Sequence, residues 1–147
     1  MAAEPAMVET APMSDLTEFL HTSMPLCATL NMRMTETAPA RVTIELDWAE
    51  DLCTANGMLH GGVVMALADS CGGACAFANL PAGAVGTSTI EPKTNFLRAV
   101  RNGTVTAIST PLPVGGTTIG IETDIVDATG KRVAKTTQTQ TVLRPKA

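Results

Sequence analysis

One stretch of the chain decides how it folds, and it reads Asn56-Gly57-Met58-Leu59-His60-Gly61-Gly62-Val63-Val64-Met65-Ala66-Leu67-Ala68-Asp69. A histidine and two glycines open an apolar helical segment, and an acid follows nine residues after the histidine. Glycines at a helix start let another group approach the free backbone N–H donors, where the helix dipole favours negative charge. A carboxylate inside an apolar helix is unfavourable unless it is paired or used. The stretch therefore predicts a site that stabilises a developing oxyanion and supplies a carboxylate, which is the chemistry of acyl transfer.

Length and composition indicate one domain with a single core. The chain has 147 residues, a formal net charge of −4 and only 3% aromatic residues. We expect residues 1–13 to be a disordered lead without the features of a secretory signal, and residues 14–147 to form the domain. There is no run of about 18 or more apolar residues, so we expect no membrane-spanning helix. Neither a basic surface nor aromatic residues for base stacking are evident, which argues against a nucleic-acid partner.

The four cysteines could form two disulfides or a metal site, or remain free. They are Cys27, Cys53, Cys71 and Cys75. Cys71 and Cys75 stand four residues apart on the predicted helix, with no histidine or further cysteine at the spacing of a zinc site. We therefore expect buried free thiols in a reducing cytoplasm, with no bound metal and no cofactor.

Hydrophobic periodicity divides the domain into strands around one central helix. A short amphipathic helix is expected over residues 14–20, capped by Ser14 or Asp15 and ended by Pro25. Strands are expected over residues 26–36, 40–48, 85–97, 104–111, 117–126 and 131–143, with a hairpin turn at residues 127–130. The helix over residues 61–77 is apolar almost all round and should be buried. Short connections make the sheet antiparallel with the helix across one face, so the fold class is α+β.

This order of elements and the motif around His60 resemble the hotdog-fold acyl-CoA thioesterases, in particular their phenylacetate-degradation (PaaI-like) branch. That pattern runs Asn-x-x-Gly-x-x-His-Gly-Gly and places an acid nine residues after the histidine, as Gly57, His60, Gly61, Gly62 and Asp69 do here. Residues 89–100 resemble the strand that follows the family's helix, and residues 127–135 resemble its closing hairpin. The resemblance covers residues 26–143 and implies an antiparallel sheet wrapped around one long central helix, which the short N-terminal helix precedes here.

Three positions depart from the family pattern. Thr54 stands where the motif has its first asparagine, and Asn56 follows two residues later. Gly115-Gly116 stands where the family often has a glycine followed by arginine or lysine, a possible contact to a CoA phosphate. Pro92 interrupts a predicted strand, which indicates an edge position or a bulge.

The spacing of the motif predicts a site that two chains share. Nine helical residues place Asp69 about 13 Å along the axis from His60, too far for both to reach one thioester. Two antiparallel helices, one from each protomer, would bring the amides of one chain to the acid of the other. The resemblance implies the same homodimer, because hotdog thioesterases join their sheets edge to edge, and we expect a homotetramer of such dimers.

We expect each candidate catalytic residue to have its own role. The backbone N–H groups of Gly61 and Gly62 would hold the oxyanion, and Asp69 of the partner subunit would attack the carbonyl or act as a general base on water. His60 would fix the loop or the thioester sulfur by hydrogen bonding, and the resemblance assigns to Thr89 the hydroxyl that positions the water or the acid. Candidate substrate-binding residues are Thr54, Asn56, Gly57, Ser70, Lys93, Arg98 and Arg101, of which the three cations could contact CoA phosphates.

Other interpretations remain open at this point. The glycines could serve only close packing between helix and sheet, and His60 could be only a helix cap. A catalytically silent module that binds acyl-CoA is the main alternative function, and a plain structural dimer is a third. The sequence does not indicate which acyl group is bound.

Overall fold

The computed structural model describes residues 12–147. Its helices are α1 (Met13–Ser23), α2 (Pro25–Thr29) and α3 (Gly61–Ala78), with two 3-10 turns, η1 (Glu50–Leu52) and η2 (Ala55–Gly57). Its strands are β1 (Arg33–Ala38), β2 (Arg41–Asp47), β3 (Gly86–Phe96), β4 (Thr104–Val114), β5 (Thr118–Val126) and β6 (Arg132–Leu143). The lead expected over residues 1–13 lies outside the described residues except for its last two, and Met13 already belongs to α1.

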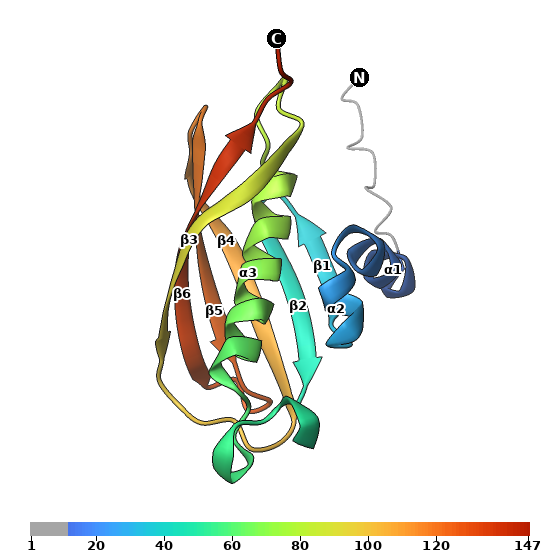
Figure 1. Ribbon diagram of the computed structural model, residues 1–147, viewed down its shortest axis with the longest axis vertical. Helices are drawn as coiled ribbons and strands as arrows, with labels where there is room; N and C mark the ends of the chain where they lie inside the picture. Colours follow the sequence, from blue (N-terminus) through green and yellow to red (C-terminus); the bar gives the residue numbers. More distant parts are fainter. Residues whose placement is uncertain (1–11) are drawn as a thin grey trace, which may run out of the picture.

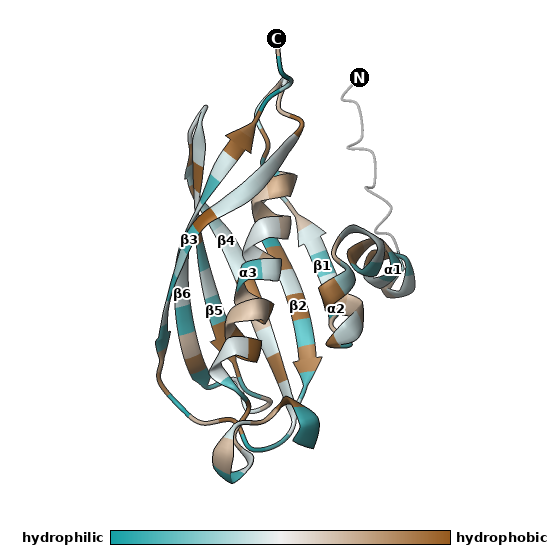
Figure 2. Ribbon diagram, viewed as in Figure 1, coloured by the Kyte–Doolittle hydropathy of each residue, from teal (hydrophilic) through white to brown (hydrophobic). Residues whose placement is uncertain are grey.

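The six strands form one antiparallel sheet in the order β1-β2-β4-β5-β6-β3. The sheet curves around α3, which lies across one of its faces, while α1 and α2 lie beside β1 (Figure 1). Successive side chains of a strand point to opposite faces, and on β5 every second residue is buried, from Ile119 to Ile125. The same alternation appears on β2 as bands of opposite hydropathy (Figure 2). The predicted α+β hotdog architecture, with its central helix and short N-terminal helix, is confirmed.

Within one chain, α3 buries only one side. Val64, Leu67, Ala68, Cys71 and Cys75 are among the residues that pack into the core against the sheet. The opposite side stays partly exposed, so the prediction of burial all round is wrong for a single chain, because one sheet covers only one side of a helix. By length and composition alone α3 could span a membrane, with a mean hydropathy of 1.4 over 18 residues, but it packs against the strands as a core helix.

Two predictions near the N-terminus are wrong. Residues 26–36, expected as one strand, form α2 and then the start of β1. Pro25 occupies the first turn of α2, where its missing N–H is not needed, and Asn31 turns the chain into β1 with a left-handed φ of 53°. Neither Ser14 nor Asp15 caps α1, because Pro12 holds the cap position and the Ser14 hydroxyl donates to Asp15 instead.

Pro92 lies in the edge strand β3, as its lack of an N–H donor predicted. The pairing of β3 with β6 also shifts register between Thr89 and Glu91, which is a bulge just before the proline. Both expected signs of a strand proline are therefore present, and β3 leaves its second edge unpaired within residues 12–147.

All four cysteines are free, and Cys27, Cys71 and Cys75 are buried. The Cys71 thiol donates to the Val42 carbonyl oxygen at 3.3 Å. Burial raises the pKa of Cys71 to about 12 and that of Cys75 to about 11. The expectation of buried free thiols is confirmed for these three, whereas Cys53 is only half-buried.

Candidate active site

His60 caps the N-terminal end of α3. Its backbone is extended, with φ −63° and ψ 133°, and its Nδ1 accepts a hydrogen bond from the Gly62 N–H at 2.8 Å. The cap satisfies one of the N–H groups that every helix start leaves without an intrahelical partner. This corrects the expectation for Gly62, whose N–H is occupied by the His60 ring and is therefore not free to hold an oxyanion.

Gly61 is the first residue of α3, and its N–H has no hydrogen-bond partner within residues 12–147. A Cβ at this position would lie 3.2 Å from the Phe96 ring, so glycine allows β3 to approach the helix start closely. Gly61, Thr54, Phe96 and Arg98 line a cavity of about 370 Å³, which we call the Gly61 cavity. An N–H donor at a helix start thus belongs to a residue that lines a space large enough for a carbonyl group to enter.

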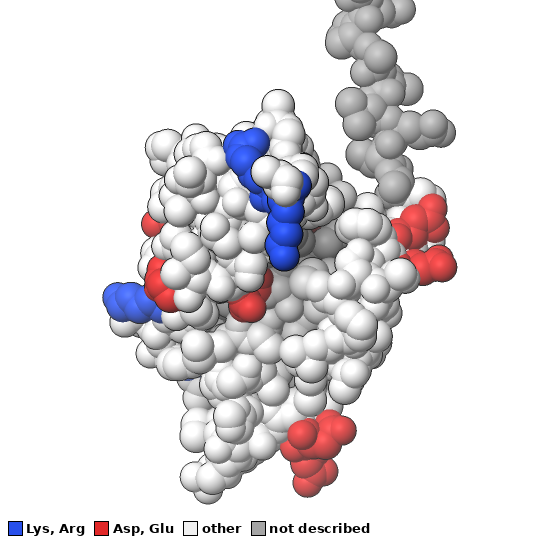
Figure 3. Space-filling view, turned by 45° about the horizontal axis from the view of Figure 1, so that its top comes forward, with Lys and Arg blue, Asp and Glu red and all other residues white. Residues whose placement is uncertain are grey.

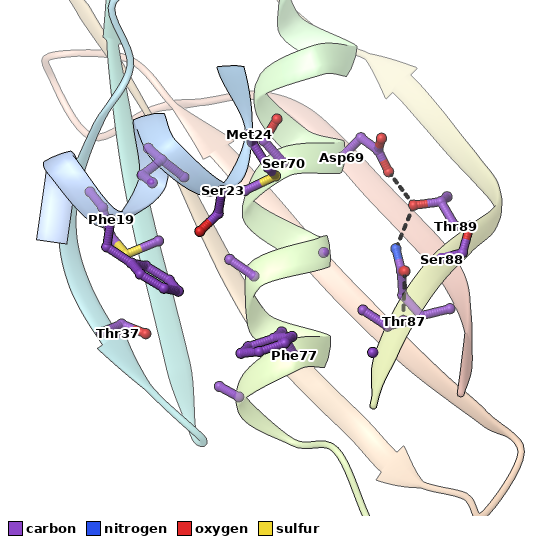
Figure 4. Close-up of a pocket in the computed structure, with 17 residues that line it drawn as sticks. Phe19, Ser23, Met24, Thr37, Asp69, Ser70, Phe77, Thr87, Ser88 and Thr89 are labelled. Atoms are coloured by element: carbon purple, nitrogen blue, oxygen red, sulfur yellow. Dashed lines mark hydrogen bonds between the residues drawn. The ribbon is translucent and has the colours of Figure 1, made fainter. Parts of the chain in front are cut away.

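Asp69 lies two turns further along α3 and lines a different, larger space. This cavity, which we call the Asp69 cavity, has a volume of about 580 Å³ and lies between α1, α3 and β3 (Figure 4). Phe19 of α1, Met24 just after that helix and Phe77 of α3 give it apolar walls. Asp69 is the only charged residue among those that line it within the described part of the chain.

Hydrogen bonds from two strands hold the Asp69 carboxylate by one oxygen. Thr89 Oγ1 of β3 donates to Asp69 Oδ1 at 2.7 Å, and Gln138 Nε2 of β6 donates to the same oxygen at 3.1 Å. Gln140 Nε2 donates to Thr89 Oγ1 at 2.7 Å. Because the Gln140 nitrogen can only donate, the Thr89 hydroxyl accepts there, and its single hydrogen is left for the bond to Asp69 (Figure 4).

The two glutamines were missed by the sequence analysis, although the sequence carries a signal for them. Gln138 and Gln140 follow Ala134 and Thr136 at alternate positions of β6, and all four side chains are buried. Two amides on the core-facing side of a strand need partners inside the protein. The identity of that partner, Asp69 on a helix about 70 residues earlier, could not be read from the strand itself.

Three predicted substrate-binding residues lie in the loop that precedes α3. Thr54 is exposed and lines the Gly61 cavity, while Asn56 and Gly57 form a turn with left-handed φ values of 63° and 67°. The Trp48 indole N–H donates to the Gly57 carbonyl oxygen at 3.1 Å, and the Arg101 guanidinium donates to the Asn56 carbonyl oxygen. Arg101 therefore fixes this loop, and its contact is with the protein backbone.

The remaining predicted contacts are spread over three places. Arg98 is exposed at the Gly61 cavity, and Ser70 is buried beside Asp69 and lines the Asp69 cavity. Lys93 pairs in register with the exposed Thr137, so it lies on the face of the sheet turned away from α3. The structure therefore separates Lys93 from the other two cations, because Arg98 and Arg101 follow the end of β3 and lie near the start of α3. Within residues 12–147 no three His, Cys, Asp or Glu side chains gather as a metal-binding group.

The catalytic candidates of one chain thus lie in two separate cavities. Gly61 and Asp69 are eight helical residues apart, about 12 Å along the axis. The face seen in Figure 3 is mostly uncharged, with acidic and basic side chains scattered over it. One cavity offers an N–H donor and the other a carboxylate with an apolar chamber, so each holds half of the groups that acyl transfer needs.

Comparisons with known proteins identify the family to which the fold and the motif around His60 correspond. The family model described as "Thioesterase superfamily" matches residues 56–134, more than half of the chain. The Saccharolobus solfataricus protein named "Putative esterase SSO2140" is 32% identical over 117 residues, which cover 80% of this chain and 82% of that protein.

Solved structures show the same fold. Thioesterase HI1161 from Haemophilus influenzae superposes with a TM-score of 0.82 at 24% identity, covering 92% of this chain and 93% of that one, and this likeness concerns the fold alone. A second solved structure is titled "Structure of a putative esterase Rv1847/MT1895 from Mycobacterium tuberculosis". It superposes with a TM-score of 0.80 at 27% identity, and the match covers 84% of this chain and 100% of that one.

Proposed function

Because the chain belongs to the thioesterase superfamily, we propose that it hydrolyses acyl-CoA thioesters to the free acid and CoA, at sites that two copies of the chain share. We further propose that it belongs to the PaaI-like branch, because its acid follows nine residues after His60, as in the pattern of that branch. The single observation that carries the proposal is the separation of the Gly61 N–H and the Asp69 carboxylate into two cavities of one chain. Two antiparallel copies of α3 would bring the N–H of one to the acid of the other.

The edge strand β3 supports the pairing of two chains. Its 11 residues form hydrogen bonds with β6 on one side only within the described residues. Ile90 and Phe96 on this strand are 59% and 52% exposed, which an isolated edge strand rarely tolerates. Pairing of two β3 edges would cover them and place the partly exposed sides of the two α3 helices together. We propose a homodimer of this kind and a homotetramer of such dimers.

Each residue then has a step in the reaction. The Gly61 N–H polarises the thioester carbonyl and holds the tetrahedral oxyanion, with the dipole of α3 behind it. Asp69 of the partner subunit either attacks the carbonyl carbon, forming an anhydride that water later hydrolyses, or removes a proton from the attacking water. Thr89 holds the carboxylate, and His60 fixes the helix start by its bond to Gly62.

The Asp69 cavity supports an uncharged, apolar acyl group. Its volume of about 580 Å³ lies in the range of about 300 to 1,000 Å³ that small-molecule sites occupy, and it exceeds the need of an acetyl group. A second carboxylate on the acyl group would lie near Asp69, and no cation is among the lining residues in the described part of the chain to pair with it. We therefore expect hexanoyl-CoA and phenylacetyl-CoA to be better substrates than acetyl-CoA or succinyl-CoA. Arg98 at the Gly61 cavity is our candidate for a CoA phosphate contact.

We also expect a cytoplasmic protein that has no nucleic-acid or membrane partner.

The first experiment measures release of the CoA thiol from these four acyl-CoAs with the unmodified protein and with Asp69→Asn. Turnover should be lost in the variant, while its melting temperature stays close to that of the unmodified protein. Asp15→Asn is the matched control, because Asp15 is exposed on α1 and lines neither cavity. Saturable binding without turnover in the unmodified protein would instead favour the silent acyl-CoA-binding module.

A second experiment tests whether the site is shared. Gly61→Pro removes the N–H, and proline is well accepted at the first helical position after the extended His60. Gly61→Ala is the control, since it brings a Cβ to Phe96 but keeps the N–H. Gly61→Pro and Asp69→Asn chains should each be inactive alone, yet a co-refolded mixture should recover about a quarter of the normal activity, because half of the dimers then hold one intact site. A mixture as inactive as its components would refute the shared site.

A further inference from the structure

Gln138 is a buried amide whose hydrogen bonding serves Asp69. Its side chain is 3% exposed, and its Nε2 donates to Asp69 Oδ1 at 3.1 Å. Its Oε1 is buried and has no hydrogen-bond partner within residues 12–147. A buried acceptor without a partner is unfavourable, and an apolar side chain of the same length would fill the space without that penalty. Stability of the core therefore does not explain the amide at this position.

Gly72 shows that α3 makes room for the same amide. A Cβ on Gly72 would lie 2.1 Å from Gln138 Oε1 and 2.4 Å from its Cδ. Glycine weakens a helix interior relative to alanine, so the helix contains a second unfavourable feature at the point where Gln138 meets it. Both features coincide with one contact, the hydrogen bond from Gln138 to Asp69.

This contact decides which oxygen of Asp69 is free. Oδ1 accepts from Thr89 Oγ1 and from Gln138 Nε2, whereas Oδ2 has no hydrogen-bond partner in the described part of the chain. The two donors come from β3 and β6, so they hold Oδ1 from two strands and fix the rotation of the carboxylate. The opposite orientation of the Gln138 amide would direct its Oε1 at the carboxylate, which is repulsive.

We infer that Gln138 is a positioning residue, which together with Thr89 holds Oδ1 so that Oδ2 is the reacting oxygen. The inference rests on the proposed thioester hydrolysis. In direct attack, Oδ2 forms a bond to the carbonyl carbon, the C–S bond breaks, and CoA leaves as the thiolate; water then hydrolyses the anhydride and restores the carboxylate. In the alternative route, Oδ2 takes a proton from water while the water oxygen bonds to the carbonyl carbon; the C–S bond then breaks, CoA leaves as the thiolate, and the proton on Oδ2 passes to that thiolate.

The test is Gln138→Met, which keeps the length of the side chain and removes both the donor and the unpartnered acceptor. The substrate is hexanoyl-CoA or phenylacetyl-CoA, whichever the unmodified protein hydrolyses faster. The kcat should fall by about 10- to 100-fold, the range expected for losing a hydrogen bond to a charged group. KM should change by no more than about twofold, and the melting temperature should be unchanged or higher. A purely structural role would lower the melting temperature together with the activity.

Two further variants keep the inference open to refutation. Thr136→Val is the matched control, because Thr136 is buried on the same face of β6 but is hydrogen-bonded to Thr94; it should lower the melting temperature and leave kcat unchanged. Gly72→Ala displaces Gln138 without altering it, so it should also lower kcat. A normal kcat in Gln138→Met overturns the inference, while the proposed function stands. If Gln138→Met does not fold, a normal kcat in Gly72→Ala has the same consequence. An unmodified protein that hydrolyses none of the four acyl-CoAs overturns both.

Discussion

Gly72 and Gly73 are adjacent in the same helix, yet alanine should affect the stability of the protein in opposite directions at the two positions. In a helix interior, glycine is about 1 kcal/mol less favourable than alanine, so a residue with free space around it should gain that amount. At Gly73 a new Cβ would meet no atom within 4 Å. Gly73→Ala should therefore raise the free energy of unfolding by about 1 kcal/mol.

Gly72→Ala should lower the free energy of unfolding, because its Cβ would lie 2.1 Å from Gln138 Oε1. Gln138 is itself 3% exposed and is bonded to Asp69, so a displacement by the new Cβ should disturb that bond. Overpacking of a core typically costs about 1–3 kcal/mol, and a lost hydrogen bond to a charged group costs about 1.5–3 kcal/mol. Subtracting the gain of about 1 kcal/mol in helix propensity leaves a net loss of about 2 kcal/mol or more.

The assay is urea unfolding followed by circular dichroism, with all proteins at the same protomer concentration because the stability of the proposed dimer would depend on it. The two variants should differ by about 3 kcal/mol, which corresponds to about 6–12 °C in melting temperature for a chain of this size. In a Gln138→Ala background the penalty at Gly72 should disappear, since the side chain that clashes is gone. If Gly72→Ala is as stable as Gly73→Ala, or the penalty survives in that background, the argument from close contact is wrong.

Three further predictions concern other parts of the molecule. His60→Ala should lower the free energy of unfolding by about 1 kcal/mol through loss of the helix cap, and His60→Asn, which also caps, should restore most of it in urea unfolding. At pH 8 a disulfide reagent such as DTNB should modify Cys53 in the native protein but not Cys71 or Cys75, whose pKa burial raises to about 12 and about 11; all four thiols should react in urea, and fast native modification of all four would contradict the burial. The Arg33 guanidinium, and secondarily the Thr104 hydroxyl, lower the pKa of Asp47 below its ordinary value of 3.8, so this carboxylate stabilises the fold above that pH and the contribution is lost as the pH falls through the lowered pKa. Unfolding from pH 6 down to pH 2 should therefore show a stability advantage over Asp47→Asn that vanishes at the acid end, and an advantage that persists at pH 2 would rule this assignment out.

The helix-opening motif was sufficient to predict the central helix and the positions of its key groups. His60, Gly61 and Asp69 are separated by fixed helical geometry, so the sequence was sufficient to predict a site that two chains share. Pro92 likewise predicted the edge strand, because a residue without an N–H cannot donate to a neighbouring strand on both sides.

Other features depended on local details that the hydrophobic pattern did not carry. Residues 26–36 alternate well enough to resemble a strand, but Pro25 and Asn31 determine the local conformation instead. The occupation of the Gly62 N–H by His60 is local, yet it depends on the rotamer of a ring that could equally have faced the solvent.

What the sequence by itself determined is the class of fold, the amide donor at the start of α3 and the acid two turns later, because these follow from periodicity and from the rise of a helix. Only the tertiary structure decided that Gln138, Gln140 and Thr89 hold that acid, and that Gly72 leaves space for the first of them. The physical reason is that antiparallel pairing of β3 with β6 and packing of α3 across them bring together side chains about 20 to 70 residues apart. No local sequence pattern predicts these contacts, because they form only when the strands between the contacting residues have all taken their places in the sheet.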